Sequence, residues 1–335
     1  MSKTCQHTHA LLITVALVLL SSVALAADPG ALPEAAASGG PKPGSILVYN
    51  YYTSSAIYPG KEDTQITLTN TGDAGSVAVH IFLINGDDCS VADLFLCLTA
   101  NQTTSFLASD LDPGVDGYAI AVASDLATGR PISYNFLTGS ESVKLASGHA
   151  ASLSAEAFPA LYQGVLPDSA ASGTAGSVSL DFNGVEYSKL PRVLALDKIS
   201  SALDGASTII VVNSLNGNLG APAGAPSIGN ISGQLFDDME NGFSFSASAR
   251  CQFRSQLSNR FPKTTPKFMS VIPAGRTGWL KLFPAADRGV TGAAISFNPR
   301  AEHRVGAFNG GANLNHLRLT EAGTSLTIPV FPPSC

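Results

Sequence analysis

The stretch Thr64-Gln-Ile-Thr-Leu-Thr-Asn70 alternates apolar and polar side chains, and a similar stretch, Ser207-Thr-Ile-Ile-Val-Val-Asn213, follows in the second half of the chain. Further pairs keep the same order in both halves: Asp87-Asp88 with Asp237-Asp238, Cys97 with Cys251, Thr103-Thr104 with Thr264-Thr265, Gly117-Tyr118 with Gly278-Trp279, and Ile132-Ser-Tyr-Asn135 with Ile295-Ser-Phe-Asn298. A repeat of this length indicates two related domains. It also serves as an internal control, because a chemical group that both copies need should be present in both.

The pattern within each copy predicts β-strands. Short alternating runs follow one another with turn residues between them and without a helical period. This spacing predicts an all-β fold with one antiparallel sandwich per copy. We expect a flexible lead-in at 27–43, a first β-sandwich at 44–140, a linker at 141–177 and a second β-sandwich at 178–335. Within the second copy, Asn183-Gly184 between two apolar runs also predicts a tight hairpin.

The motif Ile66-Thr-Leu-Thr-Asn-Thr-Gly72 resembles the opening strand and turn of immunoglobulin-like domains in exported bacterial proteins. The resemblance implies two tandem immunoglobulin-like antiparallel β-sandwiches. Those proteins have no assigned activity, so the resemblance implies no site residues. The chain differs from antibody domains, because its single tryptophan, Trp279, is not bracketed by a cysteine pair at the inter-sheet spacing.

The N-terminal segment 1–26 is typical of a cleavable signal peptide. Lys3 supplies a positive charge, Leu11–Leu20 is an almost unbroken apolar run, and Ala24-Leu-Ala26 is a small-residue cleavage site. The apolar run is shorter than a membrane span needs. We therefore expect a secreted protein, extracellular or periplasmic, with no transmembrane span in the mature chain.

The composition excludes several classes of function. The chain carries 19 Lys and Arg against 25 Asp and Glu, a formal net charge of −6, which argues against a nucleic-acid partner. Hydrophobic residues make up 45% of the chain, which is too many for a disordered protein.

Four cysteines remain after the signal peptide: Cys89, Cys97, Cys251 and Cys335. In an oxidising compartment four cysteines predict two disulfides, with three alternative pairings. We favour pairing within each copy, Cys89 with Cys97 and Cys251 with Cys335. Zinc binding is the alternative, but the chain has no Cys-x-x-Cys motif to support it.

Aromatic residues provide the first candidate site. Tyr49, Tyr51, Tyr52 and Tyr58 are close together in the sequence, and with Trp279 they are candidates for binding a sugar ring or a protein partner. Strand alternation places Tyr49 and Tyr51 on one face and Tyr52 on the other, so core packing is expected for at least one set.

Acidic residues provide a second candidate. Asp110, Asp112 and Asp116 offer closely spaced oxygen ligands that suit calcium. The matching segment Val271–Gly278 of the second copy contains no acid, so turn formation is the simpler interpretation. We expect no cofactor, with calcium as the alternative.

Histidines provide the third candidate. No Gly-x-Ser-x-Gly motif is present, but His303 and His316, near Glu302 and Asn315, would fit a metal-dependent hydrolase. The leading hypothesis is an exported non-enzymatic protein with a structural, adhesive or scaffold role, whose partner would be a protein or glycan at the cell surface. Carbohydrate binding through the tyrosines or Trp279 is the alternative, and the hydrolase is the second alternative.

Overall fold

The computed structural model describes residues 42–167, 176–222, 224, 227–298 and 310–334. These residues belong to one compact unit, Glu34–Cys335. The expected signal peptide at 1–26 and nearly all of the lead-in at 27–43 lie outside the described residues. None of the helices within the described ranges is both long and apolar enough to cross a membrane.

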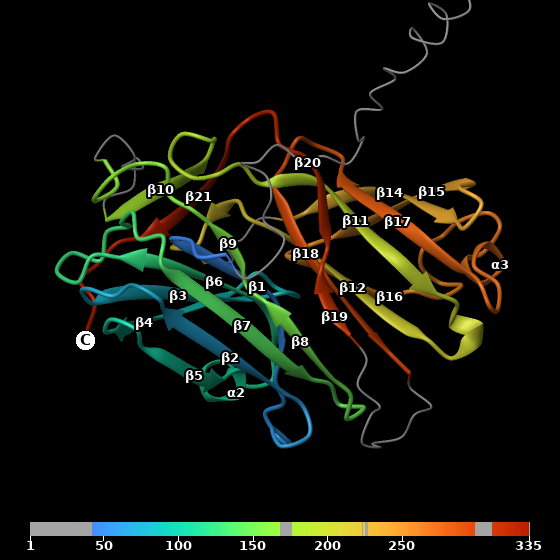
Figure 1. The fold of residues 1–335 in the computed structure, drawn as a ribbon, viewed down its shortest axis with the longest axis horizontal. Helices are drawn as coiled ribbons and strands as arrows, with labels where there is room; N and C mark the ends of the chain where they lie inside the picture. Colours follow the sequence, from blue (N-terminus) through green and yellow to red (C-terminus); the bar gives the residue numbers. More distant parts are fainter. Residues whose placement is uncertain (1–41, 168–175, 223, 225–226, 299–309, 335) are drawn as a thin grey trace, which may run out of the picture. The chain divides into compact units, whose positions relative to one another are not determined.

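The first copy forms two antiparallel sheets (Figure 1). Its elements are β1 (Ile46–Thr53), β2 (Asp63–Asn70), β3 (Val77–Asn85), β4 (Val91–Leu98), β5 (Thr103–Leu107), α2 (Ala108–Leu111), β6 (Asp116–Ser124), β7 (Leu137–Lys144), β8 (Ala150–Ser154) and β9 (Glu156–Phe158). Sheet I has the strand order β4-β3-β6-β1-β9, and sheet II has the order β5-β2-β7-β8.

The second copy also forms two sheets. Its elements are β11 (Pro191–Ser200), η3 (Ala202–Asp204), β12 (Ser207–Ser214), β14 (Gly229–Asp237), β15 (Gly242–Ala249), β16 (Gln252–Gln256), α3 (Phe268–Val271), β17 (Thr277–Pro284), β18 (Val290–Phe297), β19 (Gly311–Asn313) and β20 (Asn315–Leu319). Sheet III has the order β15-β14-β17-β11-β20, and sheet IV has the order β16-β12-β18-β19. A fifth sheet, sheet V, has the order β10-β21-β13, formed by Ser177–Phe182, Thr324–Pro329 and Gly217–Asn218.

The two copies share one topology. Sheet III repeats the strand order of sheet I, and sheet IV repeats that of sheet II, when β11 is matched with β1, β12 with β2, β14 with β3 and so on along the chain. Thr64–Asn70 lies in β2 and Ser207–Asn213 in β12, and both strands occupy the same place in their sheets. The repeated stretch that opens the sequence comparison therefore corresponds to a repeated structural element.

Some of the other sequence matches are not equivalent in the structure. Cys97 lies in β4, whereas Cys251 precedes β16, which is the counterpart of β5. Ile132–Asn135 precedes β7, whereas Ile295 lies within β18, the counterpart of β7. These matches come from short, common motifs. Only the pairing of the strands in the structure shows which matched residues occupy equivalent positions.

Gly117 of β6 and Gly278 of β17 are equivalent in detail. Each lies opposite the last residue of the neighbouring strand, β3 or β14. A β-carbon at Gly117 would collide with the backbone oxygen of Ile84, and one at Gly278 would collide with that of Phe236. The same close approach of two backbones therefore requires glycine in both copies.

We expect Gly117→Ala and Gly278→Ala each to lower the free energy of unfolding by about 1–3 kcal/mol, because the added methyl group has no space beside the neighbouring strand. Urea denaturation followed by circular dichroism measures this change. Gly60→Ala is the control, since a β-carbon there meets nothing within 4 Å. If Gly278→Ala were as harmless as Gly60→Ala, the register equivalence would be wrong.

The immunoglobulin-like interpretation is wrong, although the all-β prediction is confirmed. In an immunoglobulin domain the first two strands lie in the same sheet. Here β1 lies inside sheet I, between β6 and β9, and β2 lies in sheet II. The motif Ile66–Gly72 specifies a strand and a turn, and these are common to many β folds, so it does not identify the topology.

The connection between the copies is shorter than the sequence suggests. The segment 141–177, expected to be a linker, contains the end of β7 and all of β8 and β9. Its small side chains suit close packing: Ala151 and Leu153 of β8 contact the second copy, and a β-carbon at Gly311 would lie 2.8 Å from Leu153 and 3.0 Å from Ala151. The alanine-rich composition therefore marks a contact between sheets II and IV.

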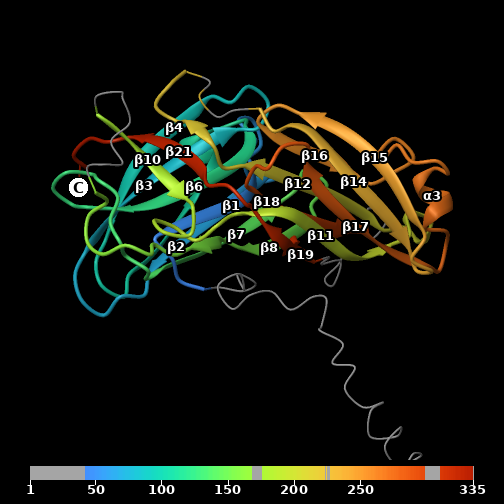
Figure 2. The ribbon, with the colours of Figure 1, turned by 90° about the horizontal axis from the view of Figure 1, so that it is seen from above.

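The five sheets, whose strands are labelled in Figures 1 and 2, are held together by four apolar clusters of the described residues. One core lies between sheets I and II and another between sheets III and IV. Sheet V covers the second face of sheet I, where Phe82, Ile84 and Ile120 pack against Leu180 and Leu326. A smaller cluster joins the outer faces of sheets II and IV.

Candidate functional site: a buried polar cluster between the copies

A bulge in β1 places polar groups at the contact between the two copies. Tyr49 pairs with Ala119 and Tyr52 with Gly117, so β1 has one more residue than β6 between these pairs. The extra residue turns Asn50 away from the regular ladder. The Asn50 side chain is fully buried.

Asn50 is the centre of a hydrogen-bond network, which we call the interface cluster: Asn50, Glu141, Glu156, Asn213, Gln252, Asn313 and His316. The Asn50 amide donates to Glu156 Oε1 at 2.6 Å and to Asn313 Oδ1 at 3.1 Å. Asn213 Nδ2 donates to the Asn50 carbonyl at 2.9 Å, and Gln252 Nε2 donates to Asn213 Oδ1 at 2.9 Å. The cluster therefore links strands of both copies.

A buried carboxylate–imidazole pair crosses the same contact. Glu156 Oε2 lies 2.9 Å from His316 Nε2, and the exposed fractions of the two side chains are 1% and 5%. Glu156 comes from β9 and His316 from β20, which are equivalent strands of the two copies. Each side chain provides a polar contact that replaces the water contacts the other loses on burial.

Glu141 is the member of the cluster with an incomplete set of hydrogen bonds. Its side chain on β7 is fully buried, and Oε1 accepts from the Tyr51 backbone N–H at 3.2 Å. Its Oε2 atom is buried without a hydrogen-bond partner. Burial, and secondarily the charge of Glu156, raises the pKa of Glu141 well above its ordinary value, although two backbone hydrogen bonds oppose the shift.

The raised pKa of Glu141 predicts a pH dependence of stability. Between the two pKa values the folded state holds a proton that the unfolded state has already released. The stabilisation linked to Glu141 is therefore complete below the pKa of the unfolded state and is lost as pH rises toward the pKa of the folded state. Glu141→Gln should remove this loss, since the amide keeps the shape without ionising. We expect the variant's advantage over the wild type to grow by about 1.4 kcal/mol per pH unit above pH ~4.3.

Denaturant titrations between about pH 4 and pH 8 measure this advantage, with the unfolded carboxyl pKa of about 4.3 as the starting point. Glu240→Gln, at an exposed turn position, is the matched control and should show no such trend. Equal pH profiles for the two variants would contradict the raised pKa of Glu141.

Three of the candidate tyrosines are inside the protein. Tyr49, Tyr51 and Tyr52 are at most 2% exposed. Their hydroxyl groups contact the Thr67 carbonyl at 3.0 Å, Arg254 at 2.9 Å and Asp112 at 2.6 Å, respectively. Burial, followed by the charge of Asp116, raises the pKa of Tyr51 to about 12. The structure thus gives these rings packing and hydrogen-bonding roles with no open face for a sugar.

The remaining aromatic candidates lie in different copies of the repeat. Tyr58 lies in the loop after β1, is 61% exposed and has the Lys61 ammonium 5.2 Å from its ring centre. Trp279 lies on β17 of the second copy and is half-buried.

The three aspartates do not converge on a common point. Asp112 accepts the hydrogen bond from Tyr52, and Asp116 forms an ion pair with Arg254 of the second copy. Asp110 is exposed in the helical turn α2. Among the described residues, no group of three His, Cys, Asp or Glu side chains could hold a metal ion.

The histidines have internal partners. His80 lies between the rings of Phe82 and Phe95, and its Nε2 is 2.7 Å from Asp93. His149 Nε2 lies 2.9 Å from the Asn298 carbonyl. For the hydrolase candidate, His303 and Glu302 lie outside the described residues, while His316 belongs to the interface cluster.

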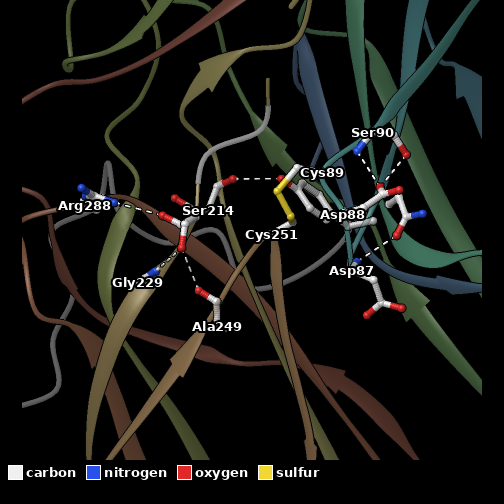
Figure 3. Close-up of a disulfide and its surroundings, with 12 residues drawn as sticks. Asp87, Asp88, Cys89, Ser90, Ser214, Gly229, Ala249, Cys251 and Arg288 are labelled. Carbon is white, nitrogen blue, oxygen red and sulfur yellow. Dashed lines mark hydrogen bonds between the residues drawn. A yellow bond between two sulfur atoms is a disulfide. The ribbon is translucent and has the colours of Figure 1, made fainter. Parts of the chain in front are cut away.

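The disulfide pairing within each copy is wrong. Cys89, in the turn after β3, is bonded to Cys251, just before β16, with 5.2 Å between their α-carbons (Figure 3). Both residues are buried. Cys97 also takes part in a disulfide, and Cys335 lies outside the described residues.

The sequence interpretation missed Asn50, Glu141 and Glu156. Glu156 is flanked by Ala155 and Ala157 in a run of buried residues, and Glu141 occupies an inward position of an alternating strand. An acidic residue within an apolar strand pattern was the available signal, but these residues fall in the segment interpreted as a linker.

Comparisons with known proteins give no family. No protein family model matches the chain, and no curated protein matches it. Similar solved structures include the Thermotoga maritima 1070 protein, with 13% identity, a TM-score of 0.25, and coverage of 33% of this chain and 90% of that one. A Bacillus subtilis oxalate decarboxylase OxdC mutant has 8% identity, a TM-score of 0.18 and coverage of 81% and 68%.

The vicilin from Solanum melongena also has 8% identity and a TM-score of 0.18, with coverage of 77% of this chain and 73% of that one. TM-scores this low provide no basis for transferring a fold or an activity to this chain.

Proposed function

We propose that the chain is an exported, non-enzymatic protein with a structural, adhesive or scaffold role outside the cytoplasm. The observation that carries this proposal is the Cys89–Cys251 disulfide, which joins a loop of the first copy to a loop of the second. Disulfides persist in oxidising compartments and are rare in the cytosol. A covalent link between two packed units makes the protein rigid, which suits a structural or scaffold role.

The interface cluster supports the same role. Its carboxylates, amides and imidazole are buried and bonded across the contact between the copies, as Glu156 is to Asn50 and His316. Buried polar networks of this kind fix the relative position of packed elements. In the proposed role these groups set geometry, and partners bind elsewhere on the surface.

The proposal is tested on protein produced in its native host and trapped with an alkylating agent before lysis. We expect the protein outside the cytoplasm, with an N-terminus at Ala27 and with Cys89 unmodified by the alkylating agent. A cytoplasmic protein with alkylated Cys89 would contradict export. Cleavage of ester, peptide or glycan substrates at enzyme-like rates would contradict the non-enzymatic role.

A further inference from the structure

The face of sheet III that points away from its apolar core carries aromatic side chains that are partly exposed. Alternate residues of β14, β15 and β17 form it, and we call it the aromatic face: Ser232, Gln234, Phe236, Ser244, Trp279, Lys281 and Phe283. The register places Phe236 opposite Trp279, Gln234 opposite Lys281 and Ser232 opposite Phe283. None of these side chains belongs to the apolar clusters formed by the described residues.

The first copy shows what the equivalent face contains when another sheet covers it. In sheet I, Ile84 lies opposite Tyr118, and Phe82 lies opposite Ile120. All four side chains are at most 1% exposed, because sheet V packs on them. In sheet III the positions of Phe82 and Ile120 are occupied by Gln234 and Lys281. The second copy therefore has polar side chains at positions where the first copy has apolar side chains covered by sheet V.

The aromatic face has an ordered platform at one end. The rings of Phe236 and Trp279 are stacked with centroids 4.0 Å apart and an angle of 6° between their planes. A β-carbon at Gly242 would lie 3.0 Å from the Phe236 ring, so that ring is held between Gly242 and Trp279. Phe283 lies on the same face of β17, roughly 13 Å along the strand from Trp279.

The polar residues determine which kind of ligand fits. A protein sheet packed here would bury the Lys281 ammonium and the Gln234 amide without partners, which is costly. A pyranose ring presents one apolar C–H surface to an aromatic ring and carries hydroxyl groups at its edge. Those hydroxyls match the donors and acceptors of Gln234, Lys281 and Ser244, all beside the stacked pair.

We propose that the aromatic face of sheet III binds neutral saccharides, with a pyranose ring over the Phe236–Trp279 pair and hydroxyl groups bonded to Gln234 and Lys281. This inference gives the proposed scaffold its ligand, and it depends on the proposed export for access to extracellular glycans.

Trp279 makes the test direct, because it is the only tryptophan of the chain and its fluorescence reports this face alone. The purified mature protein is titrated with hexasaccharides of cellulose, xylan, mannan and chitin up to about 10 mM. At least one should cause a saturable change in emission with a Kd between about 10 μM and 1 mM, the range of a small polar ligand on an open surface.

Variants assign the signal to the stacked pair. Phe236→Ala should weaken binding at least about tenfold, the loss of about 1.4 kcal/mol of contact energy, while Trp279 still reports. Lys281→Met, which keeps the aliphatic stem, should also weaken binding. Tyr58→Ala, which removes an exposed aromatic ring from another loop, is the matched control and should leave the Kd unchanged. Circular dichroism confirms that each variant is folded.

The proposal is overturned if no hexasaccharide changes the emission of Trp279, or if Phe236→Ala and Lys281→Met bind as tightly as the wild type. It is also overturned if the emission changes with protein concentration alone, because the face would then bind a second copy. None of these results would alter the location of the protein or its disulfide, so a failure here is separate from a failure of the proposed scaffold role.

Discussion

Replacing both cysteines of the Cys89–Cys251 disulfide by serine is expected to lower the free energy of unfolding by about 4–5 kcal/mol. The bond closes a loop with a sequence separation of 162 residues. In the chain-entropy description a loop of this length restricts the unfolded chain strongly, so its loss favours unfolding. The double variant is used because a single substitution would leave one cysteine free to form a wrong disulfide.

Guanidinium chloride denaturation of the oxidised wild type and of Cys89→Ser/Cys251→Ser measures the loss. Since both sulfurs are buried, we also expect dithiothreitol to reduce the wild-type bond only when denaturant opens the structure. Peptide mapping of the oxidised protein identifies the partner of Cys97 in the same experiment. A double variant as stable as the wild type would mean that the contact between the copies holds without the bond.

The fold could be predicted from the sequence at the level of class and repeat. Alternation in Thr64–Asn70, together with its similarity to Ser207–Asn213, located two equivalent central strands, because side chains of a strand alternate between faces wherever one face is buried. Gly117 and Gly278 were also matched correctly. Both positions require glycine because two backbones approach closely there, and a required glycine can be recognised in the sequence of both copies.

Long-range pairing could not be predicted in the same way. Asn183-Gly184 indicated a hairpin, but β10 instead pairs with β21 near the end of the chain. Cys89 was expected to pair with nearby Cys97, but the packing of the two copies brings Cys251 to it. Both errors have one cause: local sequence contains turn preferences, while partners distant in the chain are selected by how whole sheets pack.

The interface cluster was hidden for a related reason. Asn70 is the last residue of β2 and Asn213 the last but one of β12, and both are buried. Asn70 nevertheless bonds within its own copy to the Thr99 carbonyl, whereas Asn213 bonds across to Asn50. The residue type and the local pattern are the same in both places. Only the position of the second copy distinguishes a turn-capping asparagine from one that joins two units.

Removing one partner of the Glu156–His316 pair is the second large effect that we expect. Glu156→Ala should lower the free energy of unfolding by about 3–5 kcal/mol, because it removes the buried carboxylate that bonds both the His316 ring and the Asn50 amide. Arg318→Ala is the matched control on β20, the strand that carries His316. Its side chain is 61% exposed, so the variant should be close to the wild type.

A double-mutant cycle distinguishes pairing from simple loss of volume. If Glu156 and His316 compensate each other's burial, the double variant Glu156→Ala/His316→Ala should lose clearly less stability than the sum of the two single losses, by about 1–3 kcal/mol. Additive losses would show that the two side chains contribute only packing. Hydrogen exchange adds a positional readout: in Glu156→Ala, amides of β9 and β20 should lose protection first, since these equivalent strands meet at the pair and depend on it for their contact.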